Sequence, residues 1–207
     1  MQTGALCVIL AVFVMLDPNI VSILNRISPS GIGPDGPMFN ESELAGLARI
    51  PAAEGGLLAI VHDKDSKPDR RFVAAEALLE GGWIGWRANP EDRRAMAATL
   101  ADALARDRVH NRWGLPGEFT GGFGKQLLTL GHEGDFELRR LLDDNRPLAI
   151  AGSEAATLNV GARYRVADLA AWLLASAHGI PWHNDPDPRV RDAEILRLRN
   201  MRFPDIK

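Results

Sequence analysis

The sequence predicts an all-α protein, folded as a compact array of helical hairpins. Three observations lead to this prediction. Apolar residues recur at helical spacing in several short segments, no segment alternates apolar and polar residues as a half-buried strand would, and Pro, Gly and Asp gather between the segments. A short hairpin cannot bury its apolar face alone. We therefore expect the hairpins to stack on a shared core, as in a solenoid.

The N-terminus is expected to differ from the rest of the chain. Residues 1–38 form an apolar N-terminal segment and a linker rich in Pro and Gly, ahead of a helical domain over 39–207. The apolar run at 5–16 suits a signal-peptide core but is shorter than the roughly 20 residues of a membrane span. No Lys or Arg precedes Arg26, although a signal peptide usually begins with one. A signal peptide, a membrane-associated segment and a buried helix stay open, and so do a cytoplasmic and an extracytoplasmic or membrane-associated location.

Helical segments follow one another along the remaining chain. Asn89 is a suitable N-cap for the helix that Pro90 begins, and Ser66 or Asp69 can cap the helix with Pro68 in its first turn. The segments expected to be helical are 41–48, 55–62, 66–82, 90–107, 121–130, 134–142, 163–178 and 188–200.

Three connections lack a helical period. Residues 83–90, WIGWRANP, form an irregular link, and residues 180–188, IPWHNDPDP, separate the last two helices. Residues 143–162 are expected to form a long loop with a short helical turn after Ser153. These irregular links favour a compact, imperfect array over a long superhelix.

Composition narrows the function classes. The 207 residues include 46% hydrophobic and 25% charged ones, which indicates a globular rather than a disordered chain. The formal net charge is -3, so a nucleic-acid partner, which needs a basic face, is not expected. Cys7 is the single cysteine, which excludes a disulfide framework and a cysteine zinc cluster within one chain. No cofactor is expected.

Two segments resemble the HEAT-like (armadillo-type) helical repeat family. Residues 62–82, HDKDSKPDRRFVAAEALLEGG, have the acidic turn, the Pro or Asp before the helix, the Arg at its start and the small residues ending in Leu that a repeat shows. Residues 124–144, GKQLLTLGHEGDFELRRLLDD, resemble the inner part of another repeat. In YRVADLAAWLL, Arg165 and Asp168 match an Arg and an Asp that are common in the following helix. The resemblance covers roughly two-thirds of the chain. It implies a HEAT-like α-solenoid that serves as a binding scaffold.

Trp and Arg side chains at the hairpin ends suggest what such a scaffold binds. These two residue types are enriched at the centres of protein interfaces. The sequence therefore predicts a non-enzymatic scaffold for a protein partner. The competing interpretation is structural: the Trp side chains fill gaps beside turn glycines, and Arg165 and Asp168 form an ion pair that also bonds a neighbouring helix end. The candidate partner-binding residues are Trp83, Trp86, Arg87, Trp113, Arg165, Asp168 and Trp172.

Two further functions stay open. A metal-binding protein or metal-dependent enzyme would use residues 178–187, where His178, His183, Asp185 and Asp187 are potential ligands. Their spacing matches no established metal motif, and both Asp residues precede a Pro, as turn residues often do. The other alternative is a structural protein that associates with a membrane through residues 5–16.

A phosphate-binding loop is not expected. GGFGK at 121–125 contains the Gly-Lys of the Walker motif. Phe119, however, stands where that motif needs its first Gly, and Gln126 stands where it needs Ser or Thr.

Overall fold

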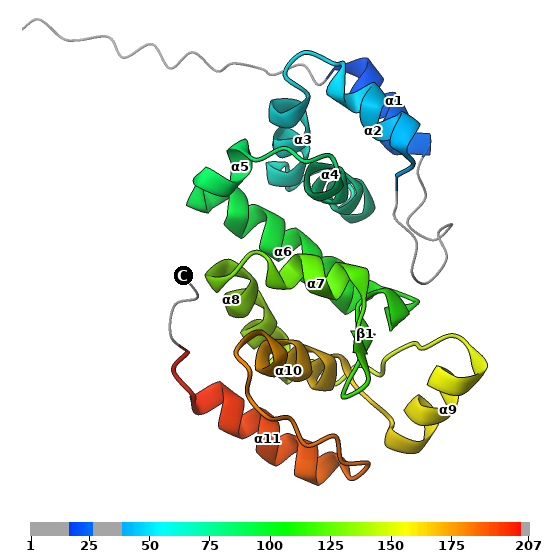
Figure 1. Cartoon of the computed structure of the whole chain (residues 1–207), viewed down its shortest axis with the longest axis vertical. Helices are drawn as coiled ribbons and strands as arrows, with labels where there is room; N and C mark the ends of the chain where they lie inside the picture. The colour runs from blue at the N-terminus through cyan, green and yellow to red at the C-terminus, as the bar shows by residue number, and fades with distance from the viewer. Residues whose placement is uncertain (1–16, 27–38, 204–207) are drawn as a thin grey trace, which may run out of the picture.

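The computed structural model describes residues 17–26 and 39–203, apart from the side chains of 153–155. This part of the chain is mostly helical, which confirms the all-α prediction (Figure 1). Its helices are α1 (Pro18–Arg26), α2 (Glu41–Ala48), α3 (Ala53–His62), α4 (Pro68–Glu80), α5 (Gly85–Ala88), α6 (Pro90–Arg106), η2 (His110–Arg112), α7 (Gly122–Leu128), α8 (His132–Arg140), η3 (Leu141–Asp143), α9 (Ser153–Ala162), α10 (Val166–Ala177) and α11 (Pro188–Asn200).

The helices stack along the long axis of the molecule. Helices α1 and α2 lie at one end and α11 at the other (Figure 1). In between, α3 packs on α4, α4 on α6, α6 on α8, α8 on α10, and α10 on α11. Helix α9 projects sideways from this stack.

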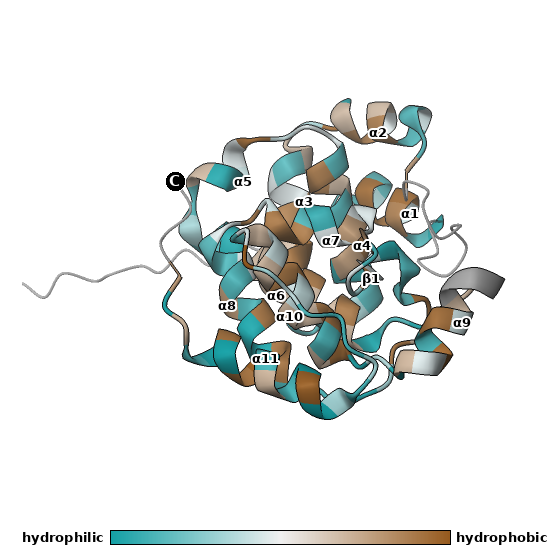
Figure 2. Ribbon diagram, turned by 60° about the horizontal axis from the view of Figure 1, so that its bottom comes forward, coloured by the Kyte–Doolittle hydropathy of each residue, from teal (hydrophilic) through white to brown (hydrophobic). Residues whose placement is uncertain are grey.

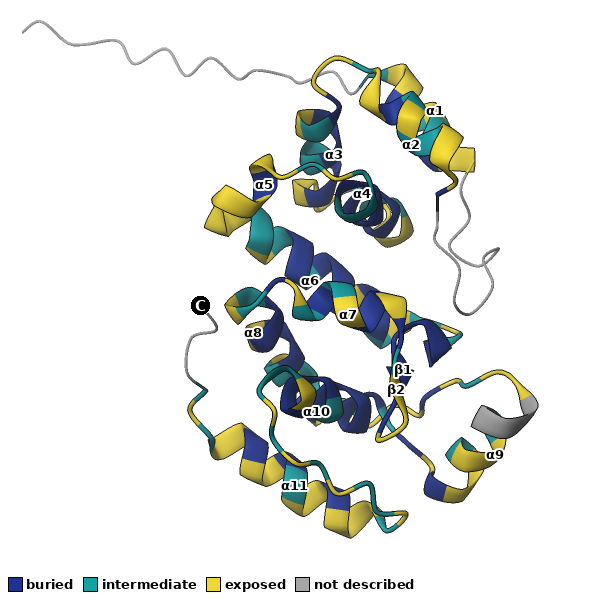
Figure 3. Ribbon diagram, viewed as in Figure 1, coloured by how far each residue is buried: buried dark blue, intermediate teal, exposed yellow. Residues whose placement is uncertain are grey.

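One apolar core runs through the stack from Ile20 of α1 to Leu198 of α11. Helix α10 lies within it. Every residue from Val166 to Ala175 is buried except Trp172 (Figure 3). Apolar residues dominate this helix around its whole circumference, which is the pattern of a helix enclosed by others (Figure 2).

Local sequence signals place several helix ends correctly. Helices α2 and α11 have the predicted boundaries, and Asn89 caps α6 by accepting a hydrogen bond from the Glu91 N–H at 3.0 Å. The prediction for the start of α4 is wrong in one respect. The Ser66 hydroxyl donates to Asp63 at 2.7 Å, and the N-cap position belongs to Lys67, which makes no side-chain cap.

Three elements lie where no regular structure was expected. Residues 143–162 contain α9, which is ten residues long rather than a single turn. Its Leu158 and Val160 are exposed, so the segment shows no apolar stripe that could reveal a helix. The link 83–90 contains the short helix α5.

The third is a small hairpin, in which strand β1 (Gly114–Leu115) pairs antiparallel with β2 (Phe119–Thr120). Each strand has only two residues, which is too short to show the alternation of apolar and polar residues by which a strand is recognised in a sequence. Gly117, with φ of 78°, provides the left-handed conformation at the turn.

The N-terminal part of the chain is described only over α1. Ile20 and Leu24 of this helix join the same core as the rest of the structure, although the sequence placed them in a separate segment. The apolar run 5–16 with Cys7, and the linker after α1, lie outside the described residues. Within the described ranges, no single helix is long and apolar enough to cross a bilayer. Helices α2 and α3 reach the required length and hydropathy only when taken together, and the chain bends by 101° between them.

Candidate functional site

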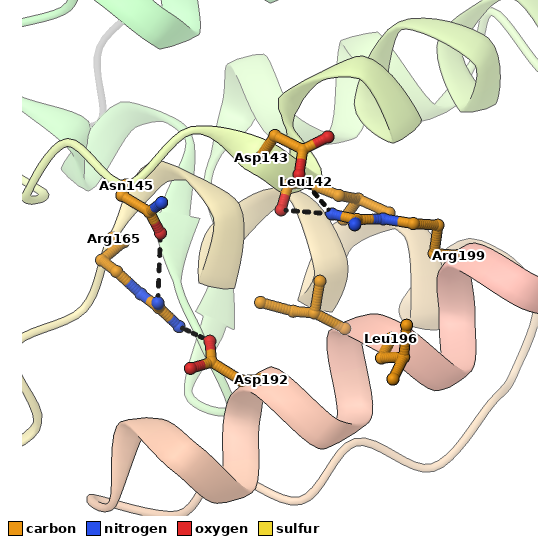
Figure 4. A pocket seen from close by; sticks show the side chains of 8 residues that line it. Leu142, Asp143, Asn145, Arg165, Asp192, Leu196 and Arg199 are labelled. Carbon is orange, nitrogen blue, oxygen red and sulfur yellow. Dashed lines mark hydrogen bonds and ion pairs between the residues drawn. The ribbon is translucent and has the colours of Figure 1, made fainter.

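A groove of about 520 Å³ lies between α11 and the segment formed by η3 and the loop after it (Figure 4). Arg165, a predicted partner-binding residue, lies in it. The lining residues are Leu142, Asp143, Asn145, Arg165, Asp192, Ile195, Leu196 and Arg199.

Arg165 is fixed on one side of the groove by Asp168. Its backbone N–H donates to Asp168 Oδ2 at 2.8 Å, its Nε to the same oxygen at 3.1 Å, and its Nη2 to Oδ1 at 2.9 Å. Hydrogen bonds to Asp168, and then to Asp192, raise the pKa of Arg165 above its usual value. The other edge of the guanidinium faces the groove, where it donates to Asn145 at 3.2 Å and to Asp192 at 2.7 Å.

Asp168 is itself part of a buried network behind the groove. Arg191 of α11 is fully buried, and its Nε lies 3.2 Å from Asp168 Oδ1 without hydrogen-bond geometry. Its Nη2 donates to the Ala162 carbonyl at the end of α9, and its Nη1 to the Asp185 carbonyl at 2.6 Å. The bond to the end of a neighbouring helix, at the Ala162 carbonyl of α9, is thus made by Arg191 and not by the Arg165–Asp168 pair itself.

Arg199 faces the groove from the opposite side. Its Nη2 donates to Asp143 Oδ1 at 2.6 Å and to the Leu142 carbonyl at 3.2 Å. The apolar side chains that line the groove are Leu142, Ile195 and Leu196. Leu142 and Leu196 both lie near Arg199 (Figure 4). Leu196 is 55% exposed, so part of this apolar lining faces solvent.

The groove is lined by guanidinium, carboxylate, amide and aliphatic side chains. No Ser, Thr, Cys, His, Tyr or Lys is among the residues that line it. Its two carboxylates, on Asp143 and Asp192, are each paired with a guanidinium.

The predicted partner-binding Trp residues do not form a common exposed face. Trp86 and Trp113 are 1% and 0% exposed, so neither contacts a partner in this conformation. Trp113 packs between Phe72 and Phe123 and donates its indole N–H to Asp107 at 2.8 Å. Both Trp side chains are therefore part of the apolar core.

The other predicted residues lie apart from one another. Trp83 and Trp172 are half-buried against the core, and Arg87 is exposed, with its guanidinium 4.8 Å from the Trp86 ring. Asp168, predicted to bind a partner, is fully buried. Of the predicted set, only Arg165 reaches the groove.

The two histidines of the metal hypothesis have separate partners. His178 Nε2 lies 2.7 Å from Asp135, and its ring stacks on Phe203 at 4.3 Å. His183 Nδ1 lies 3.2 Å from Glu194 on α11. Each ring is thus positioned by a different carboxylate.

The two aspartates shape the turn before α11. Asp185 accepts the Asp187 N–H at 2.8 Å, and Asp187 caps α11 by accepting the Arg189 N–H at 2.9 Å. Within residues 17–26 and 39–203, no three His, Cys, Asp or Glu side chains come together as metal ligands would. The structure therefore does not bring the four predicted ligands into one site.

Sequence reasoning missed most of the groove. Asp192, Leu196 and Arg199 recur at i, i+4 and i+7 on α11, next to the buried stripe, so this half carries a helical signal. Asp143 and Asn145 come from a segment without periodicity. No local pattern relates them to α11.

A second unusual side chain lies away from the groove. Glu76 of α4 is 0% exposed, and neither carboxylate oxygen has a hydrogen-bond partner. Burial raises its pKa well above the ordinary value, and Glu80 adds to the rise, whereas Gln126 and Arg112 oppose it. Its environment therefore favours the uncharged acid.

The chain matches no protein-family model, no curated protein and no solved structure. The likeness to HEAT-like repeats stays a prediction from the motifs at 62–82, 124–144 and 164–174.

Proposed function

We propose that this protein is a non-enzymatic scaffold that binds a protein partner along the groove between η3 and α11. The observation that carries the proposal is the combination, in one open groove, of three aliphatic side chains with two guanidinium groups. Arg is enriched at interface hot spots, and an apolar centre with a charged rim is the common anatomy of a protein interface.

The arrangement of the helices supports a scaffold. Helices α3, α4, α6, α8, α10 and α11 pack on one another in chain order. This is the packing expected of an imperfect, HEAT-like α-solenoid. The short α5 and α7, the hairpin of β1 and β2, and the projecting α9 interrupt any strict repeat.

The exposure of the lining favours a polypeptide over an enclosed small molecule. The side chains of Asp143 and Asp192 are 78% and 56% exposed, and that of Arg199 is 43% exposed. A small-molecule pocket usually surrounds its ligand and is mostly apolar. An open groove with charged sides instead suits a segment that lies along the surface.

Site-specific photo-crosslinking in the native cells tests this function. A photoreactive residue replaces Leu196 in the groove, and a matched control replaces Val160, which is 75% exposed on α9. We expect a discrete protein adduct from position 196 that is absent from position 160 and is lost when Arg199→Glu is added. Identical adducts from both positions, or none from position 196, would overturn the proposal.

A further inference from the structure

The chain that follows α11 contacts the ends of α8 and α10. Phe203 stacks on the ring of His178, the C-cap residue of α10, with the ring centres 4.3 Å apart and the planes inclined by 15°. The guanidinium carbon of Arg139, on α8, lies 4.3 Å from the centre of the same Phe203 ring. Both kinds of contact with an aromatic face are attractive. Residues 201–203, which make these contacts, are called the strap below.

Both side chains that hold this ring are themselves fixed. His178 Nε2 lies 2.7 Å from Asp135 Oδ2, and the two side chains are 5% and 11% exposed. Arg139 donates from Nη2 to the Met201 carbonyl at 2.7 Å and from Nη1 to the Arg199 carbonyl at 3.2 Å. Carbonyls at the C-terminal end of a helix lack partners within the helix, so a guanidinium placed there stabilises the end. The strap is therefore held both through its backbone and through its aromatic ring.

The strap is continuous with the wall of the groove. Arg139 bonds the backbone of Arg199, while the Arg199 side chain donates to Asp143 and to the Leu142 carbonyl. Arg139, Leu142 and Asp143 belong to the consecutive elements α8 and η3, so one short segment holds the last turn of α11 at both points. Loss of the strap contacts would release the backbone of this turn and, with it, the position of Arg199 in the groove.

The two ends of α11 are not held equally. Near its start, Arg191 is fully buried and donates to carbonyls of two other segments. At its end Leu198 is buried, but Arg199 is exposed, and Met201 and Phe203 are only half-buried. Segments with little buried surface and exposed hydrogen bonds open at a lower free energy than the whole fold. The strap and the last turn are therefore the part of α11 that opens first.

We propose that the strap is a latch that regulates the groove. When docked, it holds Arg199 in the groove wall; when detached, it releases the last turn of α11, and the groove loses that wall. A partner that binds the complete groove must then favour the docked strap, and docking must favour binding to the same extent. The effect on binding rests on the proposed function, whereas the docking of the strap does not.

NMR of the full-length protein with isotope-labelled histidine measures docking. Protons that lie over an aromatic face resonate upfield, so the ring resonances of His178 should lie upfield of those of His183, whose side chain is 74% exposed. Phe203→Ala should remove this shift. Arg139→Gln keeps the Phe203 ring but loses both carbonyl bonds, and it should reduce the shift. His178→Gln assigns the resonances.

Two further variants are matched controls. Phe203→Tyr keeps an aromatic ring and should keep the shift, and Arg202→Ala, at an exposed position of the strap, should leave it unchanged. Thermal melting curves confirm that each variant is folded.

Photo-crosslinking from position 196 then measures the effect on the groove. We expect Phe203→Ala to lower the yield of the partner adduct severalfold, and Phe203→Tyr and Arg202→Ala to leave it at the wild-type level. His178 resonances that are not shifted in the wild type, or a full yield of adduct in Phe203→Ala, would refute the latch. If the shift depends on Phe203 but the wild type gives no adduct, the strap docks as described, and the proposed function fails together with the control of binding.

Discussion

Arg191 and Asp168 form an ion pair from which solvent is excluded: Nε lies 3.2 Å from Oδ1, and both side chains are 0% exposed. Arg165 is the second cation on the same carboxylate, and Asp192 completes the charge balance at the surface. The carbonyls that Arg191 bonds lie at the end of α9 and in the turn before α11. One buried carboxylate thus connects α9, α10 and α11 behind the groove.

Removing this carboxylate is expected to destabilise the fold. Asp168→Asn leaves Arg191 buried without its counter-charge, which typically costs about 3 to 5 kcal/mol. Urea denaturation followed by circular dichroism measures the change. Asp192→Asn is the control, because that pair lies at the surface and should contribute less than about 1 kcal/mol. Equal effects of the two substitutions would contradict the central role of Asp168.

Glu76 is expected to make stability depend on pH. Its pKa is raised in the folded state, mainly by burial, so the folded protein holds this proton more tightly than the unfolded chain. The stability that it contributes is full below its ordinary pKa of about 4.5 and is lost as the pH rises toward the folded value. Glu76→Gln removes this loss, and the variant should be more stable than wild type by roughly 1 kcal/mol at pH 7.

The measurement is the free energy of unfolding of both proteins from pH 4 to pH 8. The advantage of the variant should grow as the pH rises. Glu118→Gln, at an exposed position, serves as control and should give no such trend. A constant difference between Glu76→Gln and wild type would show that Glu76 ionises normally in the fold.

Local sequence signals predicted much of the fold but little of the groove. The Asn89 cap and the ends of α2 and α11 depend on residues a few positions apart, so the sequence contains the information. Helix α9 was missed because its apolar side chains Leu158 and Val160 face solvent. A helix without a buried stripe has no periodicity to detect.

Asp168 was predicted to bind a partner, but its charge is neutralised by an Arg that lies far along the chain. A carboxylate beside an Arg on an amphipathic helix is normally at the surface, because burying a charge is costly. Here Arg191, on another helix, supplies a second cation and allows the carboxylate to be buried. The groove is likewise divided between α11 and a segment near Asp143, and no pattern within either one indicates the other.

His110 is expected to reduce stability in mild acid. Its Nδ1 accepts the Ala149 N–H at 3.0 Å and its Nε2 donates to the Leu104 carbonyl at 3.1 Å, which fixes the neutral ring. Burial, the largest influence, lowers its pKa below 6.5. The unfolded chain therefore binds more protons below that pH, and stability falls as the pH drops through the folded value.

Nitrogen-detected NMR of the imidazole tests this directly. We expect the Nε2–H form to persist below pH 6.5, and the decline of stability in acid to be smaller in His110→Gln. A ring that protonates at the pH of an exposed histidine would contradict the assignment.

Trp113 is expected to act on stability rather than on binding. Its ring packs on Phe72 and Phe123 in the core, and its indole N–H bonds Asp107. Trp113→Ala leaves a large cavity and should cost about 3 to 5 kcal/mol, whereas Arg87→Ala, at an exposed predicted position, should cost less than about 0.5 kcal/mol. Denaturant unfolding measures both changes. At temperatures where Trp113→Ala is still folded, its crosslinking from position 196 should match wild type, and a selective loss of those crosslinks would instead place Trp113 in the interface.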